Sequence, residues 1–274
     1  MKDPRVFLHP CGAMRSVTAG TVLERTKLTL RQTFYAMLLF CNSGTGISAH
    51  FLSRHLGISL RGAFQLGHRI RAQMALVEGI HQVGGEGVDV FIDEMLVRHS
   101  SAYPDEEGGS KKIIFGIRDC RRLTLFSLSN RKFTTIYPII EARVRTGSQI
   151  VTDGYASYKK LGAYGWKHSV VNHSKEWKNI EGYTHAPIDS IFRLIRRSLK
   201  VCYFHISSMY LWLYLKEIEF RFNRRMAGEE MFFNLIESFP ASTEEAMSSI
   251  RSNTDYADGA RTKGGVPALG RGLE

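Results

Sequence analysis

Hydrophobic residues recur at intervals of three and four in the first third of the chain, a spacing that is typical of helices. Two breaks, at Asn42-Ser43-Gly44 and at Gly57, interrupt this pattern. Ser59 stands where it would cap a further helix. The pattern therefore predicts three helices in a helix-turn-helix outline, at residues 29–42, 47–56 and 60–79.

A glycine cluster at residues 84–87 is followed by short apolar runs separated by polar turns, which are typical of strands. We expect the order three strands, helix, strand, helix, strand. The corresponding ranges are 88–97, 112–117, 122–128, 136–144, 149–152, 155–161 and 169–171. This order predicts an α/β fold.

Two more helices are expected in the last third of the chain. The first begins near Ile188, with an apolar face opposite a basic one, and the second covers residues 207–222. Beyond about Asp255 the chain is rich in glycine and poor in apolar residues, so a disordered end is expected. The resulting divisions are an irregular lead-in (1–28), a helical region (29–83), an α/β core (84–237) and a C-terminal tail (238–274).

The charge balance indicates a polyanionic partner. The 274 residues include 37 Lys and Arg against 26 Asp and Glu, a formal net charge of +11, which suits nucleic acid or an anionic membrane surface. The longest apolar run, Phe34 to Cys41, is too short to span a bilayer, and no signal segment opens the chain. Four scattered cysteines without a CxxC motif fit a reducing compartment. We therefore expect a cytoplasmic protein and favour nucleic acid over membrane as its partner.

Two aspartates stand in or next to apolar strands. Asp93 lies within residues 90–95, and Asp153 follows the run Ile150-Val151-Thr152. A buried charge needs compensation, which a metal ion can supply, and α/β folds place ligands at the carboxyl ends of strands. If neighbouring strands bring the two aspartates together, oxygen ligands favour Mg²⁺ or Mn²⁺ over zinc. The alternative is that both residues merely end strands or accept backbone hydrogen bonds.

An ordered set of short motifs extends from about Arg5 to Ile236. These motifs are Val17-Thr18-Ala19-Gly20-Thr21-Val22, Gly46-Ile47-Ser48-Ala49, His68-Arg69-Ile70-Arg71, Ile92-Asp93-Glu94, Thr152-Asp153-Gly154-Tyr155, Val171-Asn172-His173-Ser174, His185, Glu217 and Phe220-Arg221-Phe222-Asn223-Arg224-Arg225. Taken in order, the set resembles the bacterial insertion-sequence DDE transposases of the ISXO-type group.

This resemblance implies an RNase H-like core with a mixed five-stranded sheet and flanking helices, preceded by a small helix-turn-helix region. It also implies that Asp93 and Asp153 are the first two catalytic residues and metal ligands. The implied cofactor is Mg²⁺ or Mn²⁺, as two ions that assist phosphoryl transfer on DNA.

The third carboxylate of the family has two candidate interpretations in this chain. Family members have a histidine, an asparagine two positions later, and a glutamate that opens a helix with a lysine seven residues after it. Here the chain has His185, no such asparagine, Asp189, and Arg196 seven residues further on. Asp189 and Arg196 would share a helix face, which makes Asp189 the expected third ligand, with Glu181 as a rival. Alternatively, Asp189 only favours the positive end of the helix dipole.

Several residues are expected to contact DNA or support the active site. The third predicted helix would present basic and polar side chains from one side, where they could reach phosphates and base edges. The expected DNA-binding residues are Arg61, Gln65, His68, Arg69, Arg193 and Arg197. The expected active-site support comes from Glu94, His173, His185 and Arg196. The alternative for the helical pair is a structural role with a solvated basic face. Residues 220–225 either pack as a helix end or contact DNA.

The lead-in resembles the remnant of a zinc ribbon that family members carry. Cys11-Gly12 fits its last half, but Leu8 occupies the position of the partner cysteine. Four zinc ligands are therefore not present, and no zinc is expected.

The implied function is metal-dependent cleavage at insertion-sequence ends and strand transfer into target DNA, by a homodimer or higher oligomer. Two alternatives remain: a decayed or domesticated copy that binds DNA without cutting it, and an RNase H-like nuclease that hydrolyses without joining.

Overall fold

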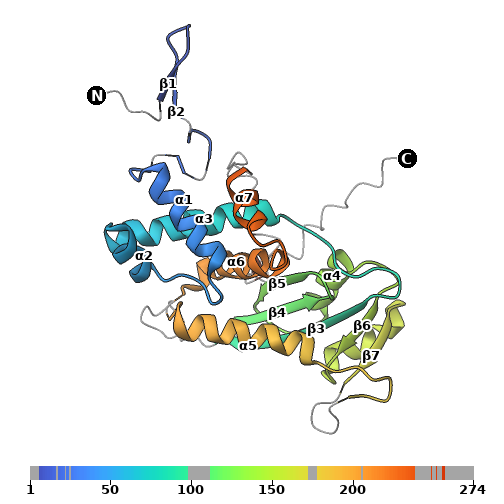
Figure 1. Cartoon of the computed structure of the whole chain (residues 1–274). Helices are drawn as coiled ribbons and strands as arrows, with labels where there is room; N and C mark the ends of the chain where they lie inside the picture. Colours follow the sequence, from blue (N-terminus) through green and yellow to red (C-terminus); the bar gives the residue numbers. More distant parts are fainter. Residues whose placement is uncertain are drawn as a thin grey trace. The chain divides into compact units, whose positions relative to one another are not determined.

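The computed structural model describes residues 6–16, 18–21, 23–24, 26–97, 112–171, 178–204, 206–237, 248, 251 and 255–256. The chain forms two compact units. The first contains Met1–Gly79, Ile195–Phe204 and Leu213–Arg251, and the second contains Ile80–Leu194, His205–Trp212 and Ser252–Glu274. Each unit therefore combines segments that are distant in the sequence, as the colours in Figure 1 show.

The first unit is mainly helical. Its described helices are α1 (Leu30–Asn42), α2 (Ala49–Leu56), α3 (Leu60–Glu78), α6 (Leu211–Asn223), α7 (Glu230–Glu237) and the end of α5 (Ala186–Val201). The side chains of Thr29, Ser48 and Ser59 cap α1, α2 and α3 by accepting hydrogen bonds from backbone amides. Gly57 ends α2 with φ +64°. The three helices predicted from the hydrophobic spacing are confirmed.

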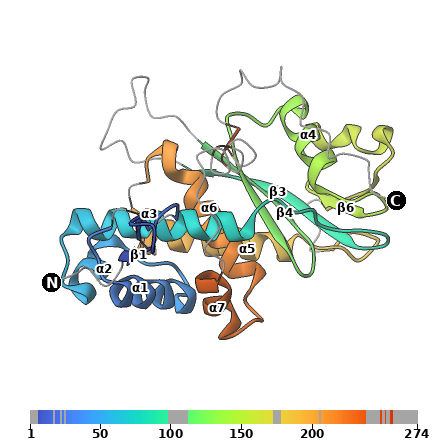
Figure 2. The ribbon, with the colours of Figure 1, turned by 90° about the horizontal axis from the view of Figure 1, so that it is seen from above.

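One apolar core holds these helices together. α2 packs against α3, and α7 packs against α1 and α3 (Figure 2). Phe40, Ile70 and Phe220 are fully buried in this core, and Leu235 joins them from α7. Burial of each such side chain contributes about 1.5–3 kcal/mol. The core therefore requires residues from both ends of the sequence.

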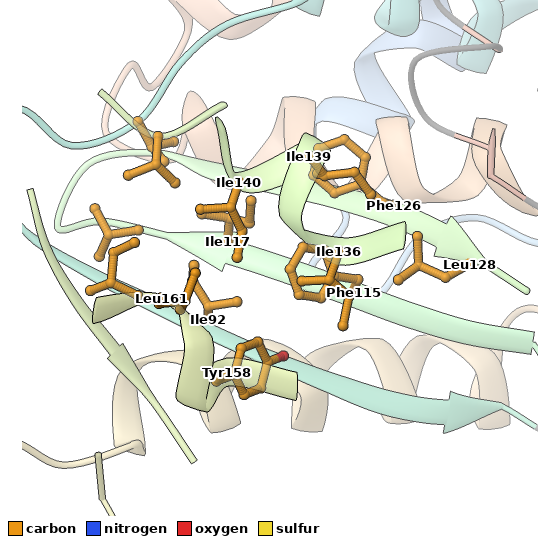
Figure 3. Packing of buried hydrophobic residues seen from close by; sticks show 14 of the residues in the cluster. Ile92, Phe115, Ile117, Phe126, Leu128, Ile136, Ile139, Ile140, Tyr158 and Leu161 are labelled. Atoms are coloured by element: carbon orange, nitrogen blue, oxygen red, sulfur yellow. The ribbon is translucent and has the colours of Figure 1, made fainter. Parts of the chain in front are cut away.

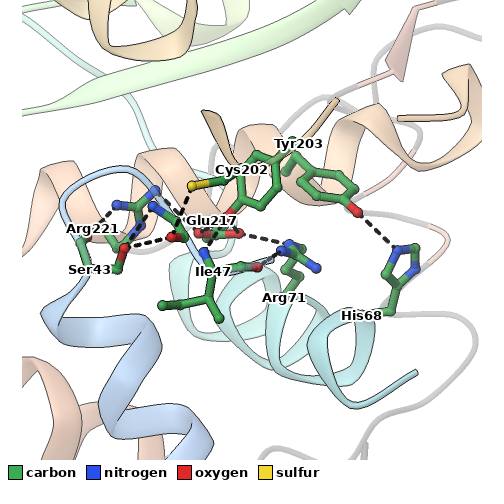
Figure 4. Close-up of polar contacts among 10 residues, drawn as sticks. Ser43, Ile47, His68, Arg71, Cys202, Tyr203, Glu217 and Arg221 are labelled. Atoms are coloured by element: carbon green, nitrogen blue, oxygen red, sulfur yellow. Dashed lines mark hydrogen bonds and ion pairs between the residues drawn. The ribbon is translucent and has the colours of Figure 1, made fainter. Parts of the chain in front are cut away.

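A buried carboxylate on α6, Glu217, connects the turn between α1 and α2 to α3 (Figure 4). It accepts hydrogen bonds from Arg71 Nε at 2.7 Å and from the Tyr203 hydroxyl at 2.7 Å, and Arg221 lies 3.2 Å away. The Tyr203 hydroxyl accepts the backbone amide of Ile47 at 3.0 Å, and Arg71 donates to the Ile47 carbonyl at 3.3 Å. The position of this turn is thus fixed by groups that are hidden from solvent.

The guanidinium of Arg71 is surrounded by aromatic rings. Its Cζ lies 5.1 Å, 5.0 Å and 4.0 Å from the ring centres of Phe40, Tyr203 and Tyr214. Burial alone would lower the pKa of Arg71, but the charge of Glu217, together with Tyr203 and Tyr214, raises it above its ordinary value. Gly46 makes this packing possible, since its φ is +99° and a Cβ there would lie 1.8 Å from the Tyr203 hydroxyl oxygen.

The lead-in is not wholly irregular, which corrects the expectation from its sequence. β1 (Val6–Leu8) pairs antiparallel with β2 (Met14–Ser16). Gly12, with φ +86°, lies in the connecting turn, where its amide donates to the His9 carbonyl. Strands of three residues are too short to show the alternation by which strands are recognised in sequences.

The second unit contains a mixed sheet in the order β7-β6-β3-β4-β5-β8. Its strands are β3 (Asp89–Val97), β4 (Lys112–Arg118), β5 (Leu123–Leu128), β6 (Gln149–Thr152), β7 (Lys167–Val170) and β8 (Asp255–Tyr256). β4 is antiparallel to β3 and β5, whereas β6 is parallel to both β3 and β7. The predicted α/β fold and its five strands are confirmed, and the short β8 adds a sixth strand beside β5.

Helices cover both faces of this sheet. α4 (Phe133–Arg143) lies on one face, where Ile136 and Ile140 pack with Ile92 and Phe115 (Figure 3). α5 lies on the other face, because a Cβ on Gly116 of β4 would be 3.0 Å from Ile188 Cδ1. Residues on β3 and β4 alternate between these two environments.

Two further differences from the sequence predictions concern irregular segments. Residues predicted as a helix at 155–161 form the 3₁₀ helix η1 (Ala156–Lys160), followed by η2 (Gly162–Tyr164). The segment between the turn at Asp153-Gly154 and Gly162 is too short for a stable α-helix. The disorder expected for the tail falls outside the described residues, apart from β8. In the described part of the chain, every helix is too short or too polar to cross a membrane.

Candidate active site

Asp93 and Asp153 occupy matching positions on two adjacent parallel strands. Phe91 of β3 pairs with Val151 of β6, and each aspartate follows two positions later. Residues two apart on a strand point to the same face, and neighbouring strands lie about 4.8 Å apart. The two carboxylates therefore stand side by side, on the face of the sheet that α5 covers.

Several carboxylates lie close enough to Asp93 to raise its pKa. Burial raises the pKa of Asp93 to about 7, and the charges of Glu94, Asp153 and Asp189 contribute to the increase. A backbone hydrogen bond from Glu94 to Asp93 Oδ1, at 2.7 Å, opposes the shift. Asp189, which lies more than 30 residues from Asp153 in the sequence, thus acts on the same carboxyl group.

Asp153 is held by the turn that it begins. Its Oδ1 accepts the backbone amide of Tyr155 at 2.9 Å, and its carbonyl accepts the Thr152 hydroxyl at 2.8 Å. Within the described residues, Oδ2 of neither Asp93 nor Asp153 accepts a hydrogen bond. Each aspartate therefore combines a fixed rotamer with a carboxylate oxygen that is available to another ligand.

Asp189 is positioned by contacts at the first turn of α5. Arg118 on β4 donates to the Pro187 carbonyl and, at 2.9 Å, to the Ser190 hydroxyl. These contacts bracket Asp189, which is half-buried. Gly116 allows α5 to approach β4 closely, because any larger residue would press against Ile188. Since Gly116 pairs with Asp93, α5 is held directly above the aspartate pair.

Glu94 lies on the opposite face of β3 and is fixed by two side chains. It accepts a hydrogen bond from the buried Tyr158 hydroxyl and one from Arg131 at 3.5 Å. Burial raises the pKa of Glu94. Arg131 also stacks on the Tyr155 ring, with 4.5 Å between Cζ and the ring centre. Glu94 therefore connects β3 to the turn that carries Asp153, which suits a supporting role.

The remaining residues expected at or near the active site are two histidines and Glu181. His185 is fully buried ahead of α5. Its expected support of the active site stays a prediction. His173 lies outside the described residues. Glu181, the rival third acid, accepts a hydrogen bond from the Ser169 hydroxyl on β7.

The chemistry of the three candidate carboxylates suits a hard divalent cation, although the side chains do not surround a common ion position. The candidate ligands Asp93, Asp153 and Asp189 offer carboxylate oxygens, the donors that Mg²⁺ and Mn²⁺ prefer. Burial first, and then the repulsion from neighbouring carboxylates, raises the pKa of Asp93, and a bound cation would relieve that repulsion. In the described residues, no three His, Cys, Asp or Glu side chains already stand close enough to hold an ion. Small side-chain movements would therefore accompany binding.

The predicted DNA-contacting residues divide into two groups. Arg61 and Gln65 on α3 are exposed, as are Arg193 and Arg197 on α5. Arg196, which was expected to support the active site, is exposed as well. His68 instead contacts the Tyr214 hydroxyl at 3.3 Å, and burial with the charge of Arg71 lowers its pKa to about 4. Arg69 donates to the Glu24 carbonyl at 2.6 Å. His68 is therefore neutral near pH 7 and supplies no charge to a phosphate.

Residues 220–225 were expected either to pack as a helix end or to contact DNA. In the structure they pack as a helix end. Phe220 is fully buried, and Arg221 donates to the Ser43 carbonyl at 2.6 Å. Arg224 contacts Glu78, and Arg225 lies over the Phe222 ring at 4.0 Å.

Sequence reasoning missed three residues that hold the site, Arg118, Arg131 and Tyr158. Each acts through a partner that is distant in sequence, and none lies in a motif that distinguishes it from an ordinary surface or core residue. An apolar strand that ends in a basic residue, as β4 does at Arg118, was the one available signal.

Comparisons with known proteins agree with this architecture. Residues 86–223, half of the chain, match the ISXO2-like transposase domain. That range contains β3, β6 and α5 with the three aspartates. A protein of Haemophilus influenzae described as an uncharacterized transposase-like protein is 32% identical over 94 residues, which cover 34% of this chain and 75% of that protein. The resemblance found in the motifs is confirmed, and the chain belongs to the family of proteins with an ISXO2-like transposase domain.

Proposed function

We propose that the chain is a DDE-type transposase with an RNase H-like core, which cleaves DNA at insertion-sequence ends and joins the freed ends to target DNA. The observation that carries the proposal is the electrostatic coupling of Asp93 to Asp153 and Asp189, which come from two adjacent strands and a helix. Carboxylates gathered in this way destabilise a protein unless a bound cation compensates them. Selection for a structural role alone would not favour such an arrangement.

Asp93, Asp153 and Asp189 would hold divalent cations, Mg²⁺ or Mn²⁺. Such ions, held by these residues, would supply activation of the attacking oxygen and stabilisation of the leaving oxygen in phosphoryl transfer. In the cleavage step, a water oxygen forms a bond to phosphorus while the bond to the 3′ oxygen breaks, which leaves a 3′-hydroxyl. In the joining step, that hydroxyl attacks a target phosphodiester and releases another 3′-hydroxyl, so no external energy source is needed.

DNA would contact exposed basic residues in both units. On α3, Arg61 and Gln65 point to solvent from the helix expected to read terminal repeats. On α5, Arg193, Arg196 and Arg197 follow Asp189 on the solvent side, so phosphates held there would lead the strand toward the carboxylates. Since two element ends must be cut, we infer that at least two copies of the chain act together on DNA.

A second candidate function is a DNA-binding copy that does not cut. Two observations favour it: aspartate replaces the expected glutamate at Asp189, and the carboxylates of the described residues do not form a closed metal cluster. Aspartate is one methylene shorter, and Mg²⁺ tolerates little deviation from contacts of about 2.1 Å.

Cleavage and strand-transfer assays separate the two candidates. The substrate is labelled DNA that carries the sequences flanking the coding region, incubated with Mg²⁺ or Mn²⁺. We expect the parent to nick and join this DNA, and Asp153→Asn to abolish both reactions while binding is kept, because the amide oxygen can still accept the Tyr155 amide. A parent that binds but never cleaves, together with an active Asp189→Glu variant, would identify a decayed copy. Unchanged cleavage by Asp153→Asn would disprove the proposed site.

A further inference from the structure

An aromatic cluster flanked by lysines lies on the second unit. The rings of Phe133 and Tyr137 on α4 are 5.0 Å apart, and Tyr164 of η2 lies 5.2 Å from the first and 4.5 Å from the second. Lys160 Nζ lies 5.7 Å from the centre of the Phe133 ring. We call these four residues, together with Lys132 and Lys159, the aromatic-lysine patch.

Core packing explains only part of this patch. Phe133 and Tyr137 pack against the core of the second unit, but Tyr164 is 54% exposed. The three lysines are also exposed, and within the described residues none of them forms an ion pair. Glu141 is an acidic side chain at the margin, where it accepts a hydrogen bond from Tyr137 at 3.3 Å. The patch thus offers an accessible ring beside uncompensated positive charge.

The patch begins at the same edge of the sheet as the aspartates. β3, β5 and β6 run parallel to one another, so their carboxyl ends share one edge. The loop after β5 carries Arg131, which stacks on Tyr155 and whose carbonyl accepts the Ser157 hydroxyl at 2.7 Å. Lys132 and Phe133 follow Arg131 directly. The patch is therefore continuous with the turn that holds Asp153.

We propose that the aromatic-lysine patch binds unpaired nucleotides at the end of a DNA strand, with a base stacked on Tyr164 and phosphates contacted by the lysines. This inference rests on the proposed function, in which a DNA end enters the aspartate site. Single-stranded DNA is the occupant favoured by the chemistry, because duplex DNA hides its base faces within the stack. Stacking on an aromatic ring combined with positive charge is the usual means of binding single strands without reading their sequence.

The test compares two DNA molecules in the absence of divalent cations. The full chain carrying Asp153→Asn is titrated in EDTA with a fluorescent blunt duplex and with the same duplex extended by about five unpaired 3′ nucleotides. We expect tighter binding of the extended duplex. Tyr164→Leu keeps the apolar packing against Phe133 and Tyr137 but removes the aromatic face, so it should weaken binding of the extended duplex about tenfold. Tyr164→Phe should bind like the parent.

A control variant and a test of one lysine complete the design. Tyr35→Leu changes a tyrosine on α1 that is 44% exposed, and it should alter neither affinity. Lys160→Gln should lower the dependence of binding on salt, by about 0.7 in the slope of log K against log salt. Equal affinities of the parent for both DNAs, or an equal effect of Tyr164→Leu on both, would overturn the inference. Failure of the proposed function would look different, since the preference for unpaired nucleotides would persist while cleavage with Mg²⁺ remained absent.

Discussion

Replacing Asp93 with asparagine should stabilise the metal-free protein at alkaline pH. The ordinary pKa of the group is 3.8, and burial among like charges raises it to about 7. The native state thus keeps a proton that the unfolded chain loses near pH 4, and stability falls as pH rises from about 4 to about 7. Asparagine carries no charge in this interval and keeps the oxygen that accepts the Glu94 amide.

The size of the effect follows from the same shift. A tenfold change in proton affinity is worth about 1.4 kcal/mol, so the gap between the two pKa values corresponds to about 4 kcal/mol above pH 7. Relaxation around the ionised group reduces this figure, and we expect a gain of about 1–4 kcal/mol at pH 8 and almost none at pH 4.

Urea unfolding in EDTA, at several pH values between 4 and 8, measures this gain. Asp153→Asn should move the pH dependence of the parent to lower pH, because one of the charges that raise the pKa of Asp93 is removed. Added Mg²⁺ should stabilise the parent and not Asp93→Asn. A constant difference between Asp93→Asn and the parent at all pH values would refute the argument, since it would show that the carboxyl does not titrate in this range.

Three further changes test other parts of the structure. Glu217→Gln should lower the free energy of unfolding by about 3–5 kcal/mol, measured in urea, because Arg71 remains buried without its counter-charge. Gly116→Ala should reduce cleavage more than tenfold at a stability cost of about 1 kcal/mol, since the new methyl group displaces Ile188 and the first turn of α5. His68→Gln should weaken the loss of stability on acidification from pH 6.5 to 4, because the partly buried imidazole takes up a proton only on unfolding in that interval.

For each of these substitutions, one result would contradict the prediction. Glu86→Gln removes an exposed ion pair with Lys167 and should cost less than about 1 kcal/mol, so an equal loss in Glu217→Gln would contradict the buried network. If Gly116→Ala cleaved DNA as well as the parent, the distance between α5 and the sheet would not control cleavage. An unchanged acid transition in His68→Gln would place the titrating group elsewhere.

The sequence predicted the helices and strands whose apolar residues recur at regular intervals. It also predicted the two aspartates that stand in or beside apolar strands. The helices before Gly79, the strands around Asp93 and Asp153, and the apolar face of α5 were all visible as spacing. The buried charges were not, because Arg71 and Glu217 look like surface residues until α3 and α6 meet. For the same reason His68 and Arg69 read as DNA contacts, although their side chains are bonded within the protein. Long-range partners leave no local pattern.

The discontinuity of the first unit has a consequence for how the protein is made. Its N-terminal helices emerge from the ribosome long before Glu217 and Phe220, which complete their core. At about 5–20 residues per second, the delay is on the order of ten seconds. During that time Arg71 has no counter-charge, and the apolar faces of α1 and α3 remain incompletely covered. An isolated N-terminal fragment would therefore stay permanently in this unfinished state, and the expected DNA-reading helices should become functional only after Glu217 and Phe220 have been synthesised.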